Sequence, residues 1–463
     1  MTTTTRPHPL VTLPGFVGVL LGRGDADYDA ARHIWNGAID RYPAFIARCT
    51  SSADVAAAVQ FGRRHDLPIA VRGGGHSIPG HSVCEGGLMI DLSPMKTVDV
   101  DPVGRTARVQ PGVLWREFDA AAQQHGLATP GGEISDTGVA GLTLGGGIGW
   151  LSRLHGLAAD NLMSVELVTA DGSLREVDDS SDPDLMWGLR GGGGNFGIVT
   201  SFHFRLHPVG PVYGGMVMFP APQAADVLRL YRDLGAGLPD CAGIVAAMIT
   251  APPVPDFPAA LRGQPVIAIA AAYFGDVAEG ERVLAPLRST IEPAVDVFGV
   301  LPYTALQQMF DAGNVPGRPA YAKSDFLREL DDAAIEQLLA HGTAPTSPFN
   351  QLVVRRLGGR FAEIDRAATA FEHRDAEHLL LIAGVWADPA ADGTAHIDWA
   401  RAAWAAIRPW FRGTYVNHLG DEGADRLREA YPDGTWDRLR ALKSRLDPGN
   451  VFALNQNIPP DTV

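Results

Sequence analysis

Apolar residues in the first part of the chain follow two spacings, one typical of helices and one typical of buried strands. Residues 25–40 carry apolar side chains at helical spacing behind an acidic start, which predicts a helix with Tyr28, Ala31, Ile34 and Trp35 on one face. An alanine- and valine-rich run predicts a second helix ending near residue 65, with Ser51 or Ser52 as its N-cap. Short apolar runs predict strands around it at residues 45–49, 69–71 and 88–92. This order predicts an α/β beginning.

Alternating apolar and polar positions predict two β-hairpins further along. Residues 97–110 alternate around a Pro-Val-Gly-Arg turn, and residues 165–177 alternate around an Ala-Asp-Gly turn. A helix is predicted over residues 114–125. Another helix follows residue 431, with a face made by Trp436, Leu439, Leu442, Lys443 and Leu446, and the Asp-Pro-Gly sequence at 447–449 ends it. Residues 213–410 carry spaced apolar strands and amphipathic helices without a glycine quartet, which predicts a separate lobe.

Length and charge exclude several classes of protein. The 463 residues exceed the usual size of one domain, and apolar residues at 46% with charged residues at 20% exclude a disordered chain. The net charge of −15, without a block of like charges, argues against nucleic acid or an anionic membrane as a partner. The N-terminal sequence lacks the apolar core of a signal peptide, so a cytoplasmic location is expected. The three cysteines, Cys49, Cys84 and Cys241, predict neither a disulfide framework nor a metal site.

Much of the glycine gathers in three clusters, at residues 73–75, 138–149 and 191–197. Glycine loops after strands can expose backbone N–H groups that bind phosphate, each charge-assisted hydrogen bond being worth about 1.5–3 kcal/mol. Ordinary tight turns are the alternative for any single cluster. A GxxxxGK[ST] sequence is absent, and GxGxxG is matched only partially, with no strand directly before it. The clusters therefore favour a dinucleotide diphosphate held by backbone donors outside a Rossmann fold.

Six motifs, in order over essentially the whole chain, carry a resemblance to a known family. They are RGGGHS at 72–77, GGLMIDLS at 86–93, GVAGLTLGGGIGW at 138–150, ADNL at 159–162, WGLRGGGGNFGIVT at 187–200, and DPGNVF with NQNIPP after residue 446. In these motifs the chain resembles the FAD-linked oxidases of the vanillyl-alcohol-oxidase type, and most closely their berberine-bridge-enzyme branch. The motifs are specific for the family and say little about the substrate.

The resemblance implies a two-lobed α+β fold that binds FAD. A split flavin lobe would comprise residues 25–210 and the C-terminal segment 411–463, while residues 211–410 would form an antiparallel sheet backed by helices that covers the flavin ring. The residues implied in FAD binding are Arg72, Gly73, Gly74, Gly75, His76, Ser77, Gly138, Gly141, Leu144, Gly145, Gly146, Gly147, Asn195, Phe196, Gly197, Val199, Asn455 and Asn457.

The resemblance also implies that His76 carries a covalent bond to the flavin, through a ring nitrogen and the methyl carbon at position 8. Such a bond is expected to raise the flavin potential. A histidine that caps a glycine turn is the alternative. Doubly linked relatives have a cysteine where this chain has Ile134, so a single bond is expected. Cys84 lies close to His76 in sequence, and a small buried side chain is expected there.

The segment Tyr415-Val416-Asn417-His418 resembles a family motif on a strand that re-enters the flavin lobe. Alternation along a strand would put Tyr415 and Asn417 on one face and His418 on the other. Relatives often have a basic tyrosine at the position of His418, which makes His418 the candidate base. Packing behind the site is the alternative, and Tyr415 is expected to form hydrogen bonds at the site's edge. Nothing in the spacing selects Tyr303, Tyr321 or Arg374, which stay unassigned.

The predicted function is that of an oxidase acting on a small molecule. A C–H bond next to an alcohol, amine or phenolic group would give a hydride to FAD, and O2 would reoxidise the flavin to yield hydrogen peroxide. Two alternatives remain open: a dehydrogenase that uses another electron acceptor, and a flavin-binding protein without turnover. The sequence leaves the substrate and the oligomeric state undetermined.

Overall fold

The first lobe begins with a small mixed sheet built around the predicted strand, helix, strand unit. The computed structural model describes residues 13–255 and 257–461. The sheet has the order β1 (Val19–Gly22), β2 (Phe45–Arg48), β4 (Leu88–Asp91) and β3 (Ile69–Arg72), and β2 and β3 both run parallel to β4. The helix α2 (Ser52–Arg64) connects β2 to β3, and the Ser51 hydroxyl caps it by accepting a hydrogen bond from the Asp54 N–H. The predictions for this unit are confirmed.

The first helix is much shorter than its apolar spacing predicts. The helix α1 covers only Tyr28–Arg32, and the backbone is extended at His33. Trp35 instead stacks on the His76 ring, with centroids 4.2 Å apart, and its backbone N–H donates to the Gly75 carbonyl. These tertiary contacts hold residue 35 out of the helix, because they need the chain to turn toward the first glycine cluster.

A second, antiparallel sheet completes the strands of the first lobe. Its order is β5 (Val98–Asp101), β6 (Thr106–Val109), β10 (Ile198–Arg205), β8 (Leu162–Val168) and β9 (Leu174–Asp178). The pairs β5/β6 and β8/β9 are the two predicted hairpins. The helices of this lobe are α3 (Trp115–Gln123), α4 (Val139–Leu144), α5 (Ser152–His155), α6 (Pro183–Leu189), α14 (Ala424–Ala430) and α15 (Asp433–Leu446). A short pair, β7 (Leu127–Ala128) and β11 (His207–Pro208), lies beside them.

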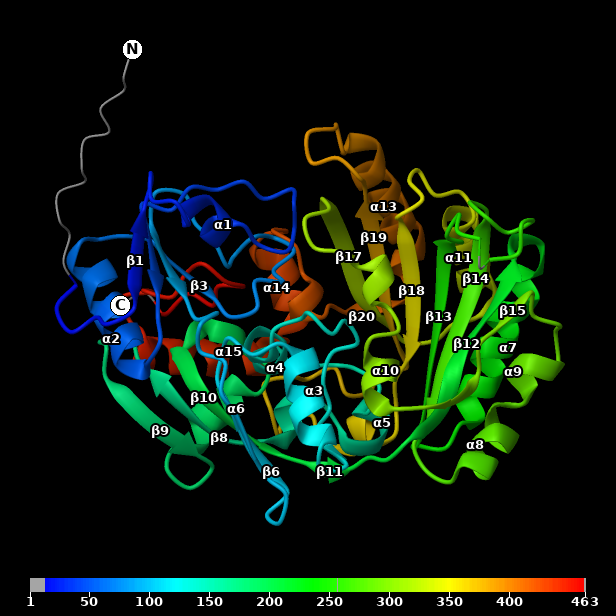
Figure 1. Cartoon of the computed structure of the whole chain (residues 1–463), viewed down its shortest axis with the longest axis horizontal. Coiled ribbons are helices and arrows are strands. Elements are labelled where there is room, and N and C mark those ends of the chain that lie inside the picture. Colours follow the sequence, from blue (N-terminus) through cyan, green and yellow to red (C-terminus); the bar gives the residue numbers. More distant parts are fainter. Residues whose placement is uncertain (1–12, 256, 462–463) are drawn as a thin grey trace.

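The second lobe is one large antiparallel sheet with most of its helices on one face (Figure 1). The strand order is β15 (Val295–Asp296), β12 (Val212–Pro220), β14 (Pro265–Tyr273), β13 (Ala242–Thr250), β18 (Gln351–Arg356), β19 (His378–Val385), β17 (Ala320–Leu327) and β20 (Phe411–Gly413), with β16 (Gly299–Leu301) also paired to β12. Its helices are α7 (Ala224–Gly237), α8 (Val277–Leu284), α9 (Pro286–Ser289), α10 (Tyr303–Gln307), α11 (Asp332–Gly342), α12 (Arg360–Glu363) and α13 (Thr394–Ile407). The predicted two-lobed α+β fold is confirmed.

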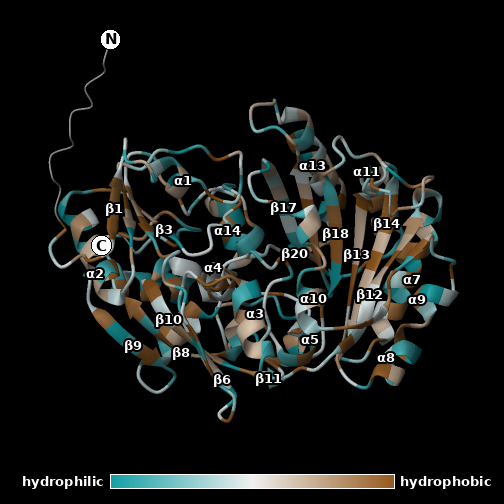
Figure 2. Ribbon diagram, viewed as in Figure 1, coloured by the Kyte–Doolittle hydropathy of each residue, from teal (hydrophilic) through white to brown (hydrophobic). Residues whose placement is uncertain are grey.

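The two faces of this large sheet have different neighbours. Alternate residues of a strand point to opposite faces, and in β13 the side chains of Ile244, Ala246 and Met248 pack against the helices. Their neighbours Val245 and Ala247 line a cavity on the other face. Because both faces are covered, the central strands are apolar almost throughout, as the brown strands in Figure 2 show.

The C-terminal segment returns to the first lobe, where the red α15 lies among blue and cyan-green elements (Figure 1). Trp436, Leu439 and Leu442 belong to the core of that lobe, as predicted for their helix face. Lys443 is fully buried, and its ammonium group donates to the Asp447 carboxylate at 2.7 Å and to the Asn195 carbonyl at 2.9 Å. This network fastens the segment to the third glycine cluster.

Six short 3-10 helices complete the described elements, at Ala159–Asn161, Gly193–Asn195, Ala221–Gln223, Asp311–Gly313, Arg408–Trp410 and Val416–His418. Within the described residues, no helix is long and apolar enough to cross a membrane. Cys84 is 3% exposed, in agreement with the expected buried side chain.

Candidate active site

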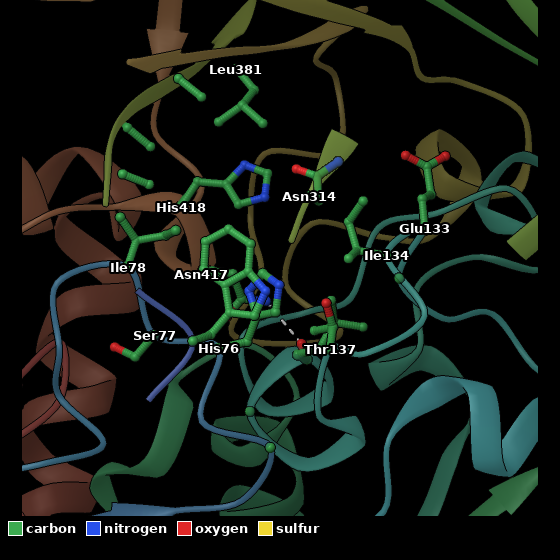
Figure 3. Close-up of a pocket in the computed structure, with 18 of the residues that line it drawn as sticks. His76, Ser77, Ile78, Glu133, Ile134, Thr137, Asn314, Leu381, Asn417 and His418 are labelled. Carbon is green, nitrogen blue, oxygen red and sulfur yellow. Dashed lines mark hydrogen bonds between the residues drawn. The ribbon is translucent and has the colours of Figure 1, made fainter. Parts of the chain in front are cut away.

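A cavity of about 1000 Å³ lies between the glycine clusters of the first lobe and the open face of the large sheet. This volume is at the upper end of the range for small-molecule and cofactor sites. In Figure 3, His76 and Thr137 lie at one end, His418 and Leu381 lie above them, and Glu133 and Ile134 face the cavity from the side opposite Ser77 and Ile78. Residues from far apart in the chain therefore meet in one site.

Most of the predicted site residues line this cavity. They are Gly73, Gly74, Gly75, His76, Ser77, Gly138, Gly141, Leu144, Gly145, Asn195, Gly197, Val199, Tyr415, His418 and Asn455. All three glycine clusters contribute to this set, so they form one continuous surface.

Five predicted residues lie outside the lining: Arg72, Gly146, Gly147, Phe196 and Asn457. The Arg72 guanidinium pairs with the buried Asp91 carboxylate at 2.7 Å, and Phe196 is fully buried in the core of the first lobe. Gly146 and Gly147 have φ angles of 120° and 87°, which few other residues adopt. Direct contact of these five residues with the cofactor stays a prediction, since they lie next to lining residues in the chain.

Two reasons explain why glycine occurs in the lining. Gly74 and Gly138 pack backbone against backbone, so a Cβ atom on either would overlap the other loop. At Gly141 and Gly194 a Cβ atom would meet nothing within 4 Å and would project into open space beside the cavity. The first pair brings two clusters together, and the second pair leaves room where a ligand can approach the backbone.

The lining fits a large polar cofactor of the FAD type. Several buried polar atoms of lining residues have no hydrogen-bond partner among the described residues, and they include His76 Nε2, His81 Nε2, Ser82 Oγ and Asn455 Oδ1. Buried polar groups are normally paired, so these atoms point to a ligand that carries donors and acceptors. Together with the glycine cradle, they match the chemistry of a dinucleotide.

His76 is held in one orientation by its neighbours. Its ring stacks on Trp35, and Nε2 lies 3.6 Å from Asp136 Oδ1. Burial lowers the pKa of His76 to about 4 and raises the pKa of Asp136 above its usual value. The imidazole is therefore neutral at pH 7, with an unpartnered nitrogen at the cavity.

His418 faces the cavity with its Nε2 atom. Its Nδ1 is hydrogen-bonded to the Ser324 hydroxyl at 3.2 Å, and that hydroxyl donates its own proton to the Leu380 carbonyl at 2.8 Å. Ser324 must then accept from His418, which assigns the imidazole proton to Nδ1 and leaves the lone pair on Nε2. Burial and the nearby His76 and Arg355 lower the pKa of His418 to about 4.

The expected strand through residues 415–418 is wrong. Strand β20 ends at Gly413, and Val416–His418 form a 3-10 turn. The rings of Tyr415 and His418 therefore contact each other, with centroids 4.9 Å apart, instead of pointing to opposite faces. The buried Tyr415 hydroxyl accepts hydrogen bonds from the Gly147 N–H at 3.0 Å and the Asn417 amide at 2.8 Å. Burial raises the pKa of Tyr415 above its ordinary value, and these hydrogen bonds offset only part of that rise.

Sequence reasoning missed a buried ion pair that spans the two lobes. Glu133, from the loop before the second glycine cluster, pairs with Arg355 on β18, and both residues line the cavity. An arginine directly after the apolar run at residues 352–354 was the available signal. Tyr303, Tyr321 and Arg374, which the sequence left unassigned, are not lining residues. Among the described residues, no group of potential metal ligands was found.

Comparisons with known proteins agree with this geometry. Residues 43–178 match the family described as FAD binding domain, and residues 414–459 match berberine and berberine like. An FAD-linked oxidoreductase of Dictyostelium discoideum is 31% identical over 447 residues, which cover 96% of this chain and 95% of that protein. (R)-6-hydroxynicotine oxidase of Paenarthrobacter nicotinovorans is 27% identical over 471 residues, which cover 98% and 99% of the two chains.

A solved structure extends the similarity to the fold. The crystal structure of 6-hydroxy-D-nicotine oxidase from Arthrobacter nicotinovorans matches with a TM-score of 0.86 and 26% identity, over 99% of this chain and 100% of that one. The resemblance stated from the motifs is confirmed. The chain is an FAD-dependent enzyme that belongs to the FAD-linked oxidoreductases of the vanillyl-alcohol-oxidase type, in their berberine-bridge-enzyme-like branch.

Proposed function

We propose that this enzyme is an oxidase of small molecules that carry a C–H bond next to an alcohol, amine or phenolic group. Bound FAD would supply the redox chemistry, accepting the hydride of that C–H bond and returning the electrons to O2 as hydrogen peroxide. The observation that carries the proposal is the shared cavity in which His76 and the glycine loops face His418 and the sheet. The similarity to 6-hydroxynicotine oxidase supports an oxidase over the alternatives.

His418 is the proposed base for the substrate's O–H or N–H proton. Its Nε2 lone pair faces the cavity, and Ser324 holds the required tautomer. The Tyr415 ring packs against the His418 ring, and the Tyr415 hydroxyl accepts hydrogen bonds from backbone N–H groups of the second glycine cluster. The base is thereby fixed relative to the loop that would hold the flavin.

We further propose that the flavin is bound covalently, by one bond to His76. The neutral ring and the unpartnered Nε2 atom at the cavity support this role. Ile134 lines the same cavity and offers no sulfur for a second bond.

The oxidase and its alternatives are separated by one experiment. The holoenzyme is mixed anaerobically with cyclic amines, secondary alcohols, sugars and phenols, and air is then admitted while flavin absorbance is followed. Reduction by a donor followed by fast reoxidation and peroxide formation is expected. Slow reoxidation in air with fast reduction of a dye would identify a dehydrogenase. A flavin that no donor reduces would identify a binding protein.

Replacement of His418 by alanine is expected to slow flavin reduction by about 10²-fold, at the lower end of the range for loss of a general base. The lower end is expected because the lowered pKa, about 4, makes His418 a weak base. The neutral form exists above that pKa, so the wild-type reduction rate should be constant above about pH 5 and fall toward pH 4. This differs from the ionisation near pH 6–7 that an unperturbed histidine would give.

Stopped-flow reduction under anaerobic conditions measures both effects. The flavin content and melting temperature of His418→Ala at each pH are the controls for folding. A variant that reduces its flavin at the wild-type rate would assign His418 to packing, and Tyr415→Phe would then be the variant to measure.

A further inference from the structure

The face of the large sheet that lines the cavity is almost entirely apolar. Six of its strands, β12, β13, β14, β17, β18 and β19, present small or aliphatic side chains there: Met216, Met218, Val245, Ala247, Ile249, Ala268, Ala270, Ala320, Ala322, Val353, Leu379, Leu381, Ala383 and Val385. The many alanines leave the surface broad and shallow. Such a surface suits a flat ring system, because it offers contact area without deep side-chain pockets.

A sugar would find few partners on this face. Burying a hydroxyl without a hydrogen bond is unfavourable, so carbohydrate sites need many polar side chains. The polar residues that the sheet strands contribute to the lining are Thr250, Gln351 and Arg355, and the Gln351 amide already donates to the Gly313 carbonyl at 3.1 Å. Polar recognition on this side of the cavity therefore depends mainly on Arg355.

Arg355 has hydrogen-bond donors for which the described part of the chain supplies no acceptor. Its side chain is 8% exposed, and among the described residues it contacts the Glu133 carboxylate and the face of the Trp150 ring, 5.5 Å from the ring centroid. A guanidinium group carries several N–H donors in one plane, and a single carboxylate cannot satisfy them all. Burial lowers the pKa of Arg355 to about 9, so the group is still a cation at pH 7. The charge of Arg355 lowers the pKa values of both Tyr415 and His418, so Arg355 lies near the proposed base.

The charge of the pair selects the kind of group that Arg355 can bind. Glu133 already neutralises the guanidinium, so a carboxylate ligand would add an unpaired negative charge to a buried site. A neutral oxygen acceptor adds no charge and still satisfies the free N–H donors. A ring carbonyl or a phenol oxygen is such an acceptor.

We propose that the substrate is a flat, mainly apolar ring compound with a neutral acceptor oxygen, which Arg355 binds while the rings lie against the alanine-rich face of the sheet. The inference rests on the proposed function and names the substrate class of the same site. Arg355 is thus a specificity-determining residue, and Glu133 sets the charge that it accepts.

Ligand binding to the holoenzyme tests this proposal without turnover. Calorimetry compares 1-tetralone with tetralin, which lacks the oxygen, with 1,2,3,4-tetrahydro-1-naphthoate, which replaces it by a carboxylate, and with cellobiose. We expect 1-tetralone to bind most tightly. Arg355→Met should weaken 1-tetralone binding by about 10- to 100-fold and leave tetralin binding unchanged, because only the hydrogen bond is removed.

Glu133→Gln provides a second variant with an expected gain. It frees the positive charge of Arg355, so binding of 1,2,3,4-tetrahydro-1-naphthoate should strengthen by about 10-fold or more relative to 1-tetralone. If Arg355→Met loses its flavin, ligand binding to Glu133→Gln is the measurement that decides. Equal binding of 1-tetralone and tetralin to the wild type, tighter binding of cellobiose, or no change in preference with Glu133→Gln would overturn the proposal. An enzyme that binds 1-tetralone as expected but fails the peroxide assay would refute the oxidase reaction alone.

Discussion

Removal of residues 426–463 is expected to abolish formation of the holoenzyme. The deletion takes away Trp436, Leu439, Leu442, Phe452 and Ile458, all of which are at most 5% exposed. Burial of each large apolar side chain contributes about 1.5–3 kcal/mol, so their sum is comparable with the whole stability of a typical protein. The deletion also removes the Gln456 carbonyl and the Ile458 N–H, which are hydrogen-bonded to the Asn195 side chain in the third glycine cluster. Flavin content of the purified truncated chain is the measurement.

A point substitution in the same segment is a sharper test. Lys443→Met leaves the fully buried Asp447 carboxylate without its cation, and breaking such a buried pair typically costs about 3–5 kcal/mol. Arg440→Met on the same helix removes a partly exposed pair with Asp461 and should cost less than about 1 kcal/mol. Denaturant unfolding of the two variants gives both values. A truncated chain with full flavin content would show that the C-terminal segment is not part of the flavin lobe. Equal losses of unfolding free energy in the two point variants would show that the Lys443–Asp447 pair does not stabilise the segment.

His76→Ala is expected to lose all covalently bound flavin. The wild-type protein should stay yellow after denaturation and acid precipitation, because a bond to His76 would survive unfolding. The variant should release its flavin into the supernatant, since Ile134 offers no sulfur for a second bond. Mass spectrometry of a digest should find flavin on the peptide that contains His76 and on none that contains a cysteine.

His81→Ala is the matched control for this experiment. His81 lines the same cavity, and burial lowers its pKa to about 4, as for His76. Its replacement should leave the covalent flavin in place. Release of flavin from the wild type, or an equal loss in both histidine variants, would refute the bond to His76.

The family and the fold could be predicted because the motifs are local. Ser51 caps α2 through its own backbone neighbourhood, and each hairpin follows from alternation around a turn within one short segment. Each glycine cluster is likewise a short run of adjacent residues, so its unusual backbone conformations can be predicted from the sequence. Predictions from apolar spacing were wrong where contacts with distant residues determined the structure. Trp35, for example, stacks on His76 and does not extend α1.

The boundaries at residues 210 and 411 stay a prediction, and the truncation tests only whether the C-terminal segment belongs to the flavin lobe. The choice of His418 and Tyr415 as neighbours of the site came from the motif, but their arrangement did not. A turn at 416–418 replaces the expected strand, because Asn417 and Tyr415 bind the second glycine cluster across the cavity. That contact joins segments more than 260 residues apart, so no local pattern records it.

By itself, the sequence determined the two-lobed α+β fold, FAD as the cofactor and a set of residues that line the cavity, since these depend on short motifs and on glycine. Only the tertiary structure decided which nitrogen of His418 faces the cavity, how far burial lowers its pKa, and that Glu133 pairs with Arg355 beneath an apolar sheet. The physical reason is that pKa values and ion pairs depend on burial and on neighbours from other elements, and those are set only when the lobes pack together.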